Sequence, residues 1–103
     1  MTTAVTNAAT LAAFAERYRD RPWCHFDQQP WPVQGRWTLV CTKVVQRVIT
    51  GPRALRDEYH RGFSGVKAWT ELSRADRESW DRVYLAAVRA WQAAEAQERE
   101  VAA

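Results

Sequence analysis

The stretch "RWTLVCTKVVQRVIT", residues 36–50, decides how the rest of the chain is interpreted. Its many β-branched residues are typical of a strand, but they do not alternate with polar residues as a half-buried strand requires. Its apolar residues recur instead every three or four positions, and they are Trp37, Val40, Cys41, Val44, Val45, Val48 and Ile49. This 3.6-residue period predicts an amphipathic helix over residues 36–50.

Further helices are expected on the C-terminal side of this stretch. Gly51 followed by Pro52 is typical of one helix ending and the next beginning, and we expect that next helix over residues 52–61. Its inward side chains would be Ala54, Leu55 and Tyr59. Gly62 would end it, and Ser64 would begin a brief helix that reaches Trp69.

A long last helix is the clearest prediction. Ser73 with Asp76 three residues later is a variant of the capping box. A 3.6-residue apolar stripe follows, made of Trp80, Val83, Tyr84, Ala87, Val88 and Trp91. We expect this helix to run to about Glu100, roughly 40 Å in all.

On the N-terminal side, residues 1–9 are rich in Thr, Ala and Asn and are expected to form a flexible arm. Thr10 would cap a helix over residues 11–19 that Pro22 ends, because the residue before a proline avoids helical angles. Its inward side chains would be Leu11, Phe14, Ala15 and Tyr18. Residues 23–35 read as an irregular loop with an extended corner at Pro30, Trp31 and Pro32.

These elements predict an all-α fold of four to five helices with a Trp-rich core. Residues 10–100 would form a single domain, and residues 101–103 a frayed tail. A chain of 103 residues is long enough to bury one core without a metal or disulfide. Four of its six tryptophans occupy helical-face positions and are expected in the core: Trp37, Trp69, Trp80 and Trp91.

The sequence also predicts a cytoplasmic protein with no membrane contact. The first residues lack the basic and apolar regions of a secretory signal, and no apolar run approaches the ~20 residues of a membrane span. Cys24 and Cys41 are the only cysteines, and we expect both to be reduced thiols.

We expect neither a metal, nor a cofactor, nor a reaction. Cys24, His25, Cys41 and His60 are possible zinc ligands, but they lack the paired spacing of two to four residues that zinc sites use. A Cys–His nucleophile would need a lowered thiol pKa, of which the sequence carries no sign. "GFSGV", residues 62–66, lacks the last glycine of a nucleophile elbow.

A mild basic excess is concentrated in the first part of the chain. The net charge is +3, and residues 1–61 hold nine basic and five acidic residues. Lys43 and Arg47 would share the exposed side of the central helix, near Arg36, Arg53, Arg56 and Arg61. These residues either solvate the surface or attract an acidic partner or phosphates.

The aromatic residues of the 23–35 segment have no periodic reason to be buried. Trp23, Phe26 and Trp31 either fold back as a lid over the core or present an anchor to a partner. We expect a protein-binding accessory or regulatory module whose partner has an acidic surface. The expected partner-binding residues are Trp23, Phe26, Trp31, Arg36, Lys43 and Arg47.

"WTELSRADRESWDRVYLAAVRAW", residues 69–91, resembles the second half of an HMG box in the spacing of Trp69, Leu72, Ser73 and Trp80. The resemblance implies an L-shaped helical domain that binds and bends DNA at the minor groove. The chain departs from the family in having Tyr84 where the family has alanine, and in its acidic end. Its Ala/Arg/Trp-rich composition is also similar to that of small accessory proteins of bacteriophages.

The sequence is also compatible with two other functions. A nucleic-acid-binding domain of HMG-box-like or helix-turn-helix type would use Lys43, Arg47, Arg53, Arg56 and Arg61. A structural assembly subunit would form a homo-oligomer through its long C-terminal helix.

Overall fold

The computed structural model describes residues 3–102, and over that range helices are the only regular secondary structure, with no strands. The α-helices are α1 (Thr3–Arg17), α2 (Trp31–Val45), α3 (Pro52–Tyr59) and α4 (Arg74–Ala102). Two short 3-10 turns, η1 (Phe26–Gln28) and η2 (Trp69–Glu71), lie in the connections. The predicted all-α class with a long C-terminal helix is confirmed.

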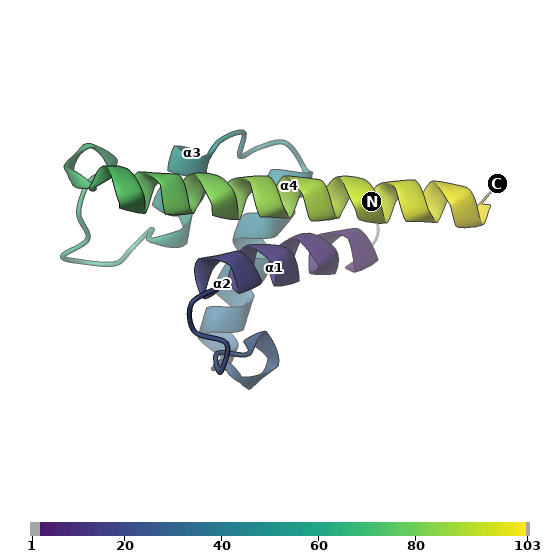
Figure 1. Ribbon diagram of the computed structural model, residues 1–103, viewed down its shortest axis with the longest axis horizontal. Helices are drawn as coiled ribbons and strands as arrows, with labels where there is room; N and C mark the ends of the chain where they lie inside the picture. Colours follow the sequence, from purple (N-terminus) through teal and green to yellow (C-terminus); the bar gives the residue numbers. More distant parts are fainter. Residues whose placement is uncertain (1–2, 103) are drawn as a thin grey trace.

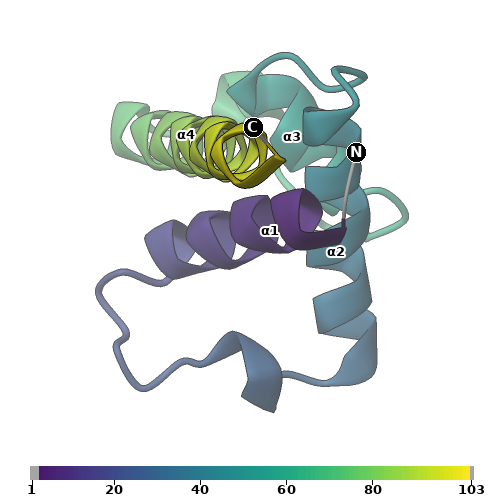
Figure 2. The same cartoon turned by 90° about the vertical axis from the view of Figure 1, so that its right-hand side faces the viewer.

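The helices form two crossed layers. Helix α1 runs antiparallel along α4, α2 crosses this pair, and α3 packs against α4 (Figure 1). The first turns of α2 lie at the end of that helix farthest from α4 (Figure 2). The molecule measures 48 × 28 × 25 Å, and its length follows α4, whose C-terminal part extends beyond the start of α1.

Helix α1 begins at Thr3 and not after Thr10. Val5, Ala9 and Ala13 are fully buried, so the predicted arm is wrong for residues 3–9, while residues 1–2 lie outside the described range. Alanine has a weak hydrophobic signal in sequence, but its small side chain lets two helices approach closely, as α1 and α4 do.

The inward face of α1 also differs from the prediction. Thr10 is no cap, because its hydroxyl donates to the Thr6 carbonyl oxygen within the helix, at 2.8 Å. Phe14 is buried as expected, whereas Leu11 and Ala15 are exposed. The true face is set by the residues that contact α4 and α2.

Helix α2 begins at Trp31, five positions before residue 36. Pro30 is its extended N-cap, and Trp31 and Pro32 form the first turn, so the predicted extended corner is wrong for these two residues. A proline fits the first turn because the N–H that it lacks would have no partner inside the helix. The Val33 and Gln34 N–H groups donate to the Pro30 carbonyl oxygen, at 3.0 and 3.1 Å.

The end of α2 comes at Val45 and not at residue 50. Arg47 adopts a left-handed conformation with φ of 61°. The Val48 N–H donates to the Lys43 carbonyl oxygen at 2.9 Å, and the Arg47 N–H to that of Val44 at 3.0 Å. This is a Schellman end, in which arginine occupies the position that glycine usually takes. Val48, predicted to be inward, is therefore exposed.

Helix α3 is shorter than predicted, and no helix begins at Ser64. Leu55 is buried as expected, but Ala54 is exposed and Arg56 is buried in its place. Between α3 and η2 the chain forms a loop, in which Gly62 and Gly65 have φ of 84° and 73°.

Of the four α-helices, α4 agrees best with the prediction from the sequence. The Asp76 N–H donates to the Ser73 hydroxyl at 3.1 Å, which confirms the predicted cap. The predicted stripe is buried at Trp80, Val83, Ala87 and Trp91 and half-buried at Tyr84 and Val88. Residues 101–102, predicted to be a frayed tail, continue the helix, and residue 103 lies outside the described range. No helix of residues 3–102 is both long and apolar enough to cross a membrane.

Aromatic rings occupy the centre of the core. The Trp37 ring lies 4.6 Å from that of Tyr59, 5.9 Å from that of Phe14 and 6.4 Å from that of Trp80, measured between centroids. Trp37, Trp80 and Trp91 are buried as predicted, and Trp69 is half-buried at the edge of the core.

Candidate functional site

The aromatic residues of the 23–35 segment separate into two kinds. Phe26 packs edge-on against Phe14, with the ring centroids 5.4 Å apart, and so covers the core. Trp31 is 85% exposed and Trp23 is 72% exposed. The lid alternative therefore holds for Phe26 and fails for the two tryptophans.

Side-chain amides hold the connection before α2 in place. The Gln34 amide donates to the carbonyl oxygens of Gln29 at 2.8 Å and Asp27 at 3.3 Å. The Gln29 amide donates in turn to the His25 carbonyl oxygen at 3.1 Å. These bonds tie η1 to the first turn of α2, so the backbone that carries Trp31 is held from both sides.

An open hollow of about 410 Å³ lies between α2 and the C-terminal end of α3, and we call it the α2–α3 groove. Pro32, Gly35 and Leu39 supply its apolar lining, and its charged lining residues are Arg36, Lys43, Glu58 and Arg61. Trp31, Gly35, Leu39 and Lys43 follow one another at four-residue spacing, so they form one row along α2 with Trp31 at its end.

A single carboxylate is shared by two cations in the groove. Glu58 pairs with Lys43 and, at 3.3 Å, with Arg61. The hydrogen bond from the Lys43 ammonium holds the pKa of the Glu58 carboxyl below its usual value, against the effect of desolvation, and Arg61 and Arg36 act in the same direction as Lys43. The groove consequently keeps an excess of positive charge.

Arg36 links α2 to the end of α3. Its guanidinium donates to the carbonyl oxygens of Tyr59 at 3.2 Å and Arg61 at 3.0 Å, which the end of α3 leaves without helical partners. The same guanidinium lies 4.7 Å from the centre of the Phe63 ring. Arg36 therefore has a structural role as well as a place in the groove.

Arg47 does not join Lys43 on one helical face as predicted. It lies beyond the end of α2, and its guanidinium stacks 4.9 Å above the Trp91 ring. Lys43 faces α3 instead, where it meets Glu58. The structure thus separates these two predicted binding residues.

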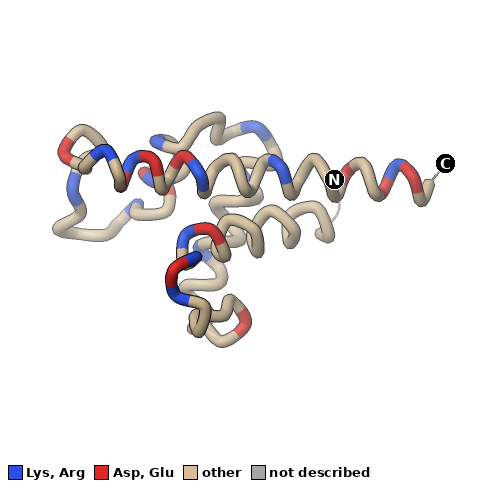
Figure 3. Tube along the Cα trace, in the orientation of Figure 1, with Lys and Arg blue, Asp and Glu red and all other residues tan. Residues whose placement is uncertain are grey.

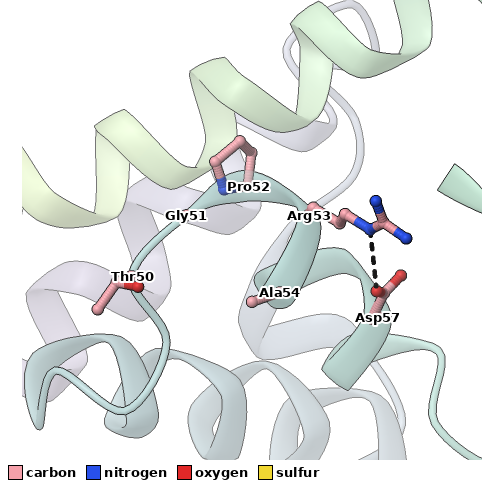
Figure 4. Close-up of a pocket in the computed structure, with 6 residues that line it drawn as sticks. All are labelled: Thr50, Gly51, Pro52, Arg53, Ala54 and Asp57. Atoms are coloured by element: carbon pink, nitrogen blue, oxygen red, sulfur yellow. Dashed lines mark ion pairs between the residues drawn. The ribbon is translucent and has the colours of Figure 1, made fainter. Parts of the chain in front are cut away.

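The remaining basic residues of the nucleic-acid alternative are scattered. Arg56 is buried, and its guanidinium donates to the Lys67 carbonyl oxygen at 2.7 Å. Arg53 lies at a shallow hollow at the start of α3, where it pairs with Asp57 at 3.9 Å (Figure 4). Basic and acidic positions are interspersed along the first half of α4 and in the connection after α1 (Figure 3).

The sequence predicts that the four possible zinc ligands do not form a zinc site; these are Cys24, His25, Cys41 and His60. Among residues 3–102, no group of three or more His, Cys, Asp or Glu side chains is placed to hold a metal ion. Burial raises the pKa of the Cys41 thiol to about 12, so this cysteine is a protonated core residue and no nucleophile. The Cys24 sulfur accepts a hydrogen bond of 3.5 Å from the Gln29 amide.

The sequence assigned no binding role to four residues that line the groove: Pro32, Gly35, Leu39 and Glu58. Gly35 and Leu39 were assigned no role, although both lie four residues from a neighbour in the row that starts at Trp31. That spacing has meaning only if the helix begins at Trp31. Glu58 had no signal, because its partner Lys43 is fifteen residues away.

No protein-family model, curated protein or solved structure matches this chain. The HMG-box resemblance of residues 69–91 stays a prediction. In the structure, Ser73 caps α4, Trp80 is buried and Trp69 lies in the single turn η2.

Proposed function

We propose that this chain is a protein-binding module of accessory or regulatory type, with the α2–α3 groove as its docking surface and Trp31 as the main anchor. The observation that carries the proposal is the 85% exposure of Trp31 on the first turn of a regular helix. Tryptophan is among the residues most enriched at binding hot spots, because it buries a large area with few rotatable bonds.

The surroundings of Trp31 support this role. Leu39, 51% exposed, extends the apolar surface along α2, and Arg36, Lys43 and Arg61 provide a charged rim. Interfaces commonly combine an apolar centre with such a rim. Because hydrogen bonds already hold the backbone at Trp31, docking would order little of the chain, which favours affinity.

The test is a selection of ligands from displayed libraries of random peptides and of helical hairpins, with the wild-type protein as target. We expect ligands that bind the wild type at micromolar or tighter Kd and lose at least about tenfold in affinity with Trp31→Ala, or ~1.4 kcal/mol. The Tm of Trp31→Ala should stay within about 2 °C of the wild type, because the side chain contributes little to the core.

Leu11→Ala is the control variant, since Leu11 is 52% exposed on α1 and lies outside the groove. It should leave ligand affinity unchanged. Trp23→Ala measures what the second exposed tryptophan contributes. Failure to obtain ligands, or ligands that bind Trp31→Ala as tightly as the wild type, would overturn the proposal.

A further inference from the structure

Gly35 is the residue of the groove that the fold itself does not explain. It is an exposed interior residue of α2, where glycine is disfavoured relative to alanine because it loses more backbone entropy. Apart from the adjacent residues and the nearby backbone of α2 itself, a Cβ atom at this position would meet no heavy atom within 4 Å, and the backbone is not left-handed there. Nothing within the described chain therefore requires a glycine.

Glycine in a regular helix has one further use, which is to let another backbone approach closely. Here it opens a notch in the row along α2, between Trp31 and Leu39 on either side. These two residues are eight positions apart, or about 12 Å along the axis, which is roughly two helical turns. A notch between two large side chains fits a ridge of a second helix packed across α2.

The charges at the groove indicate the composition of that helix. Arg36, Lys43 and Arg61 face only one carboxylate among the lining residues, that of Glu58. A partner that covered the groove with neutral or basic residues would desolvate three cations that share the single Glu58 carboxylate, whereas partner carboxylates would offset the remaining positive charge.

We infer that the α2–α3 groove receives an acidic amphipathic α-helix of a partner protein, which places a small residue over Gly35 and carboxylates beside Arg61 and Lys43. This inference rests on the proposed function and specifies the partner of that same surface. A partner strand is disfavoured, because helices α2 and α3 offer no row of unpaired backbone groups to extend.

The ligands selected above provide the probes. We expect the helical-hairpin library to yield ligands in which Asp and Glu outnumber Lys and Arg and in which Ala, Gly or Ser lies at the centre of the binding face. Gly35→Ala should raise the Tm by roughly 4 °C, because alanine is the better helix former and its Cβ meets nothing. The same substitution should weaken these ligands at least about tenfold. A variant that is more stable and yet binds less tightly has not failed through misfolding.

Two matched pairs of variants localise the contact. Leu39→Ala should weaken the ligands, and Leu11→Ala, at nearly the same exposure, should not. Arg61→Glu should weaken them at least about tenfold, and Lys in place of a ligand carboxylate should restore binding. Arg53→Glu is the control, since Arg53 is also exposed and also pairs with an acidic residue of α3, but lies outside the groove.

The outcomes separate the two proposals. Ligands that need Trp31 but tolerate Gly35→Ala, or that carry no acidic excess, would overturn the acidic-helix inference and leave the protein-binding proposal standing. Ligands indifferent to Trp31→Ala, or an empty selection, would overturn both. Sedimentation of the protein alone tests whether a second copy of this chain occupies the groove. Self-association that Gly35→Ala abolishes would assign the groove to that second copy and overturn the inference of a different partner protein.

Discussion

Arg47 shows at the scale of one residue how a helix end is fixed by its partner across the fold. The left-handed conformation is unfavourable for a residue with a Cβ atom, by roughly 1–2 kcal/mol. Arg47 adopts it nevertheless, with φ of 61°, and its guanidinium stacks on the Trp91 ring. The stacking on α4 and the Schellman hydrogen bonds at the end of α2 together compensate for the backbone strain.

The strain at Arg47 leads to a prediction about two substitutions. Both Arg47→Gly and Arg47→Ala remove the contact with Trp91, but only glycine relieves the left-handed backbone. Arg47→Gly should therefore be more stable than Arg47→Ala by about 1 kcal/mol in urea unfolding. Gln46, whose φ is −76°, is the control position. There the order should reverse, and Gln46→Ala should be more stable than Gln46→Gly. Equal stability of the two Arg47 variants would contradict the explanation.

At the scale of the element, α3 is held at its C-terminal end by groups from other helices. Arg36 binds two carbonyl oxygens there, and Lys43 binds the Glu58 carboxylate. His60, which follows α3, lies edge-on to the Trp80 ring with the centroids 5.7 Å apart. Burial lowers the pKa of His60 below its usual 6.5.

The lowered pKa values of His60 and Glu58 predict that the protein loses stability in acid, in two stages. A lowered His60 pKa means that the unfolded chain binds the proton more readily, so the free energy of unfolding should fall as the pH drops below about 6.5. The contribution of Glu58, whose pKa is also lowered, is complete above its usual 4.5 and is lost as the pH falls through its folded value.

Thermal unfolding between pH 8 and pH 3 measures both stages. His60→Gln should flatten the dependence of Tm on pH just below pH 6.5, and Glu58→Gln should flatten it below pH 4.5. A His60→Gln protein with the wild-type slope between pH 7 and pH 5 would show that another group is responsible for the first stage.

At the scale of the whole molecule, the net charge of +3 does not translate into one basic surface. The basic residues expected to bind phosphates have different surroundings in the fold, and several are paired or buried. Lys43 and Arg61 share Glu58, Arg53 pairs with Asp57, and Arg56 is inside. These residues therefore do not present the continuous run of free cations that would follow a row of phosphates.

Duplex DNA of random sequence should consequently bind weakly. We expect a Kd no tighter than about 100 µM at 0.15 M salt by fluorescence anisotropy, at the weak end of non-specific binding, with a shallow dependence on salt. Micromolar binding that weakens steeply with salt would instead favour the nucleic-acid alternative. The double variant Lys43→Ala, Arg47→Ala would then test the basic residues assigned to it.

The sequence was most informative where a pattern is local. The stripe from Trp80 to Trp91 and the cap at Ser73 could be predicted, since each depends on residues a few positions apart. The boundaries of α1 and α2 could not. The buried face of α1 is made largely of alanines, which give little hydrophobic signal in the sequence. Pro32 suggests a loop, although a proline also fits the first turn of a helix.

The candidate site was predictable only in part. The sequence left Trp31 open between a lid over the core and an anchor for a partner, because a large aromatic residue in a loop has no periodic reason for burial. That Trp31 lies on a helix, in one row with Gly35 and Leu39, became visible only with the observed start of α2. Arg47 was assigned to the wrong surface, because the helix that should have carried it ends before it.

By itself, the sequence determined that the chain is helical, and it determined which residues of α4 face the core. Both follow from helix periodicity and capping, which depend only on residues close together in the sequence. The tertiary structure alone decided which charges are paired and which aromatic side chains stay in water. Lys43 meets Glu58 and Arg36 meets the end of α3 across fifteen to twenty-five residues of chain. Such contacts depend on how the helices pack, and packing brings together residues that no local pattern relates.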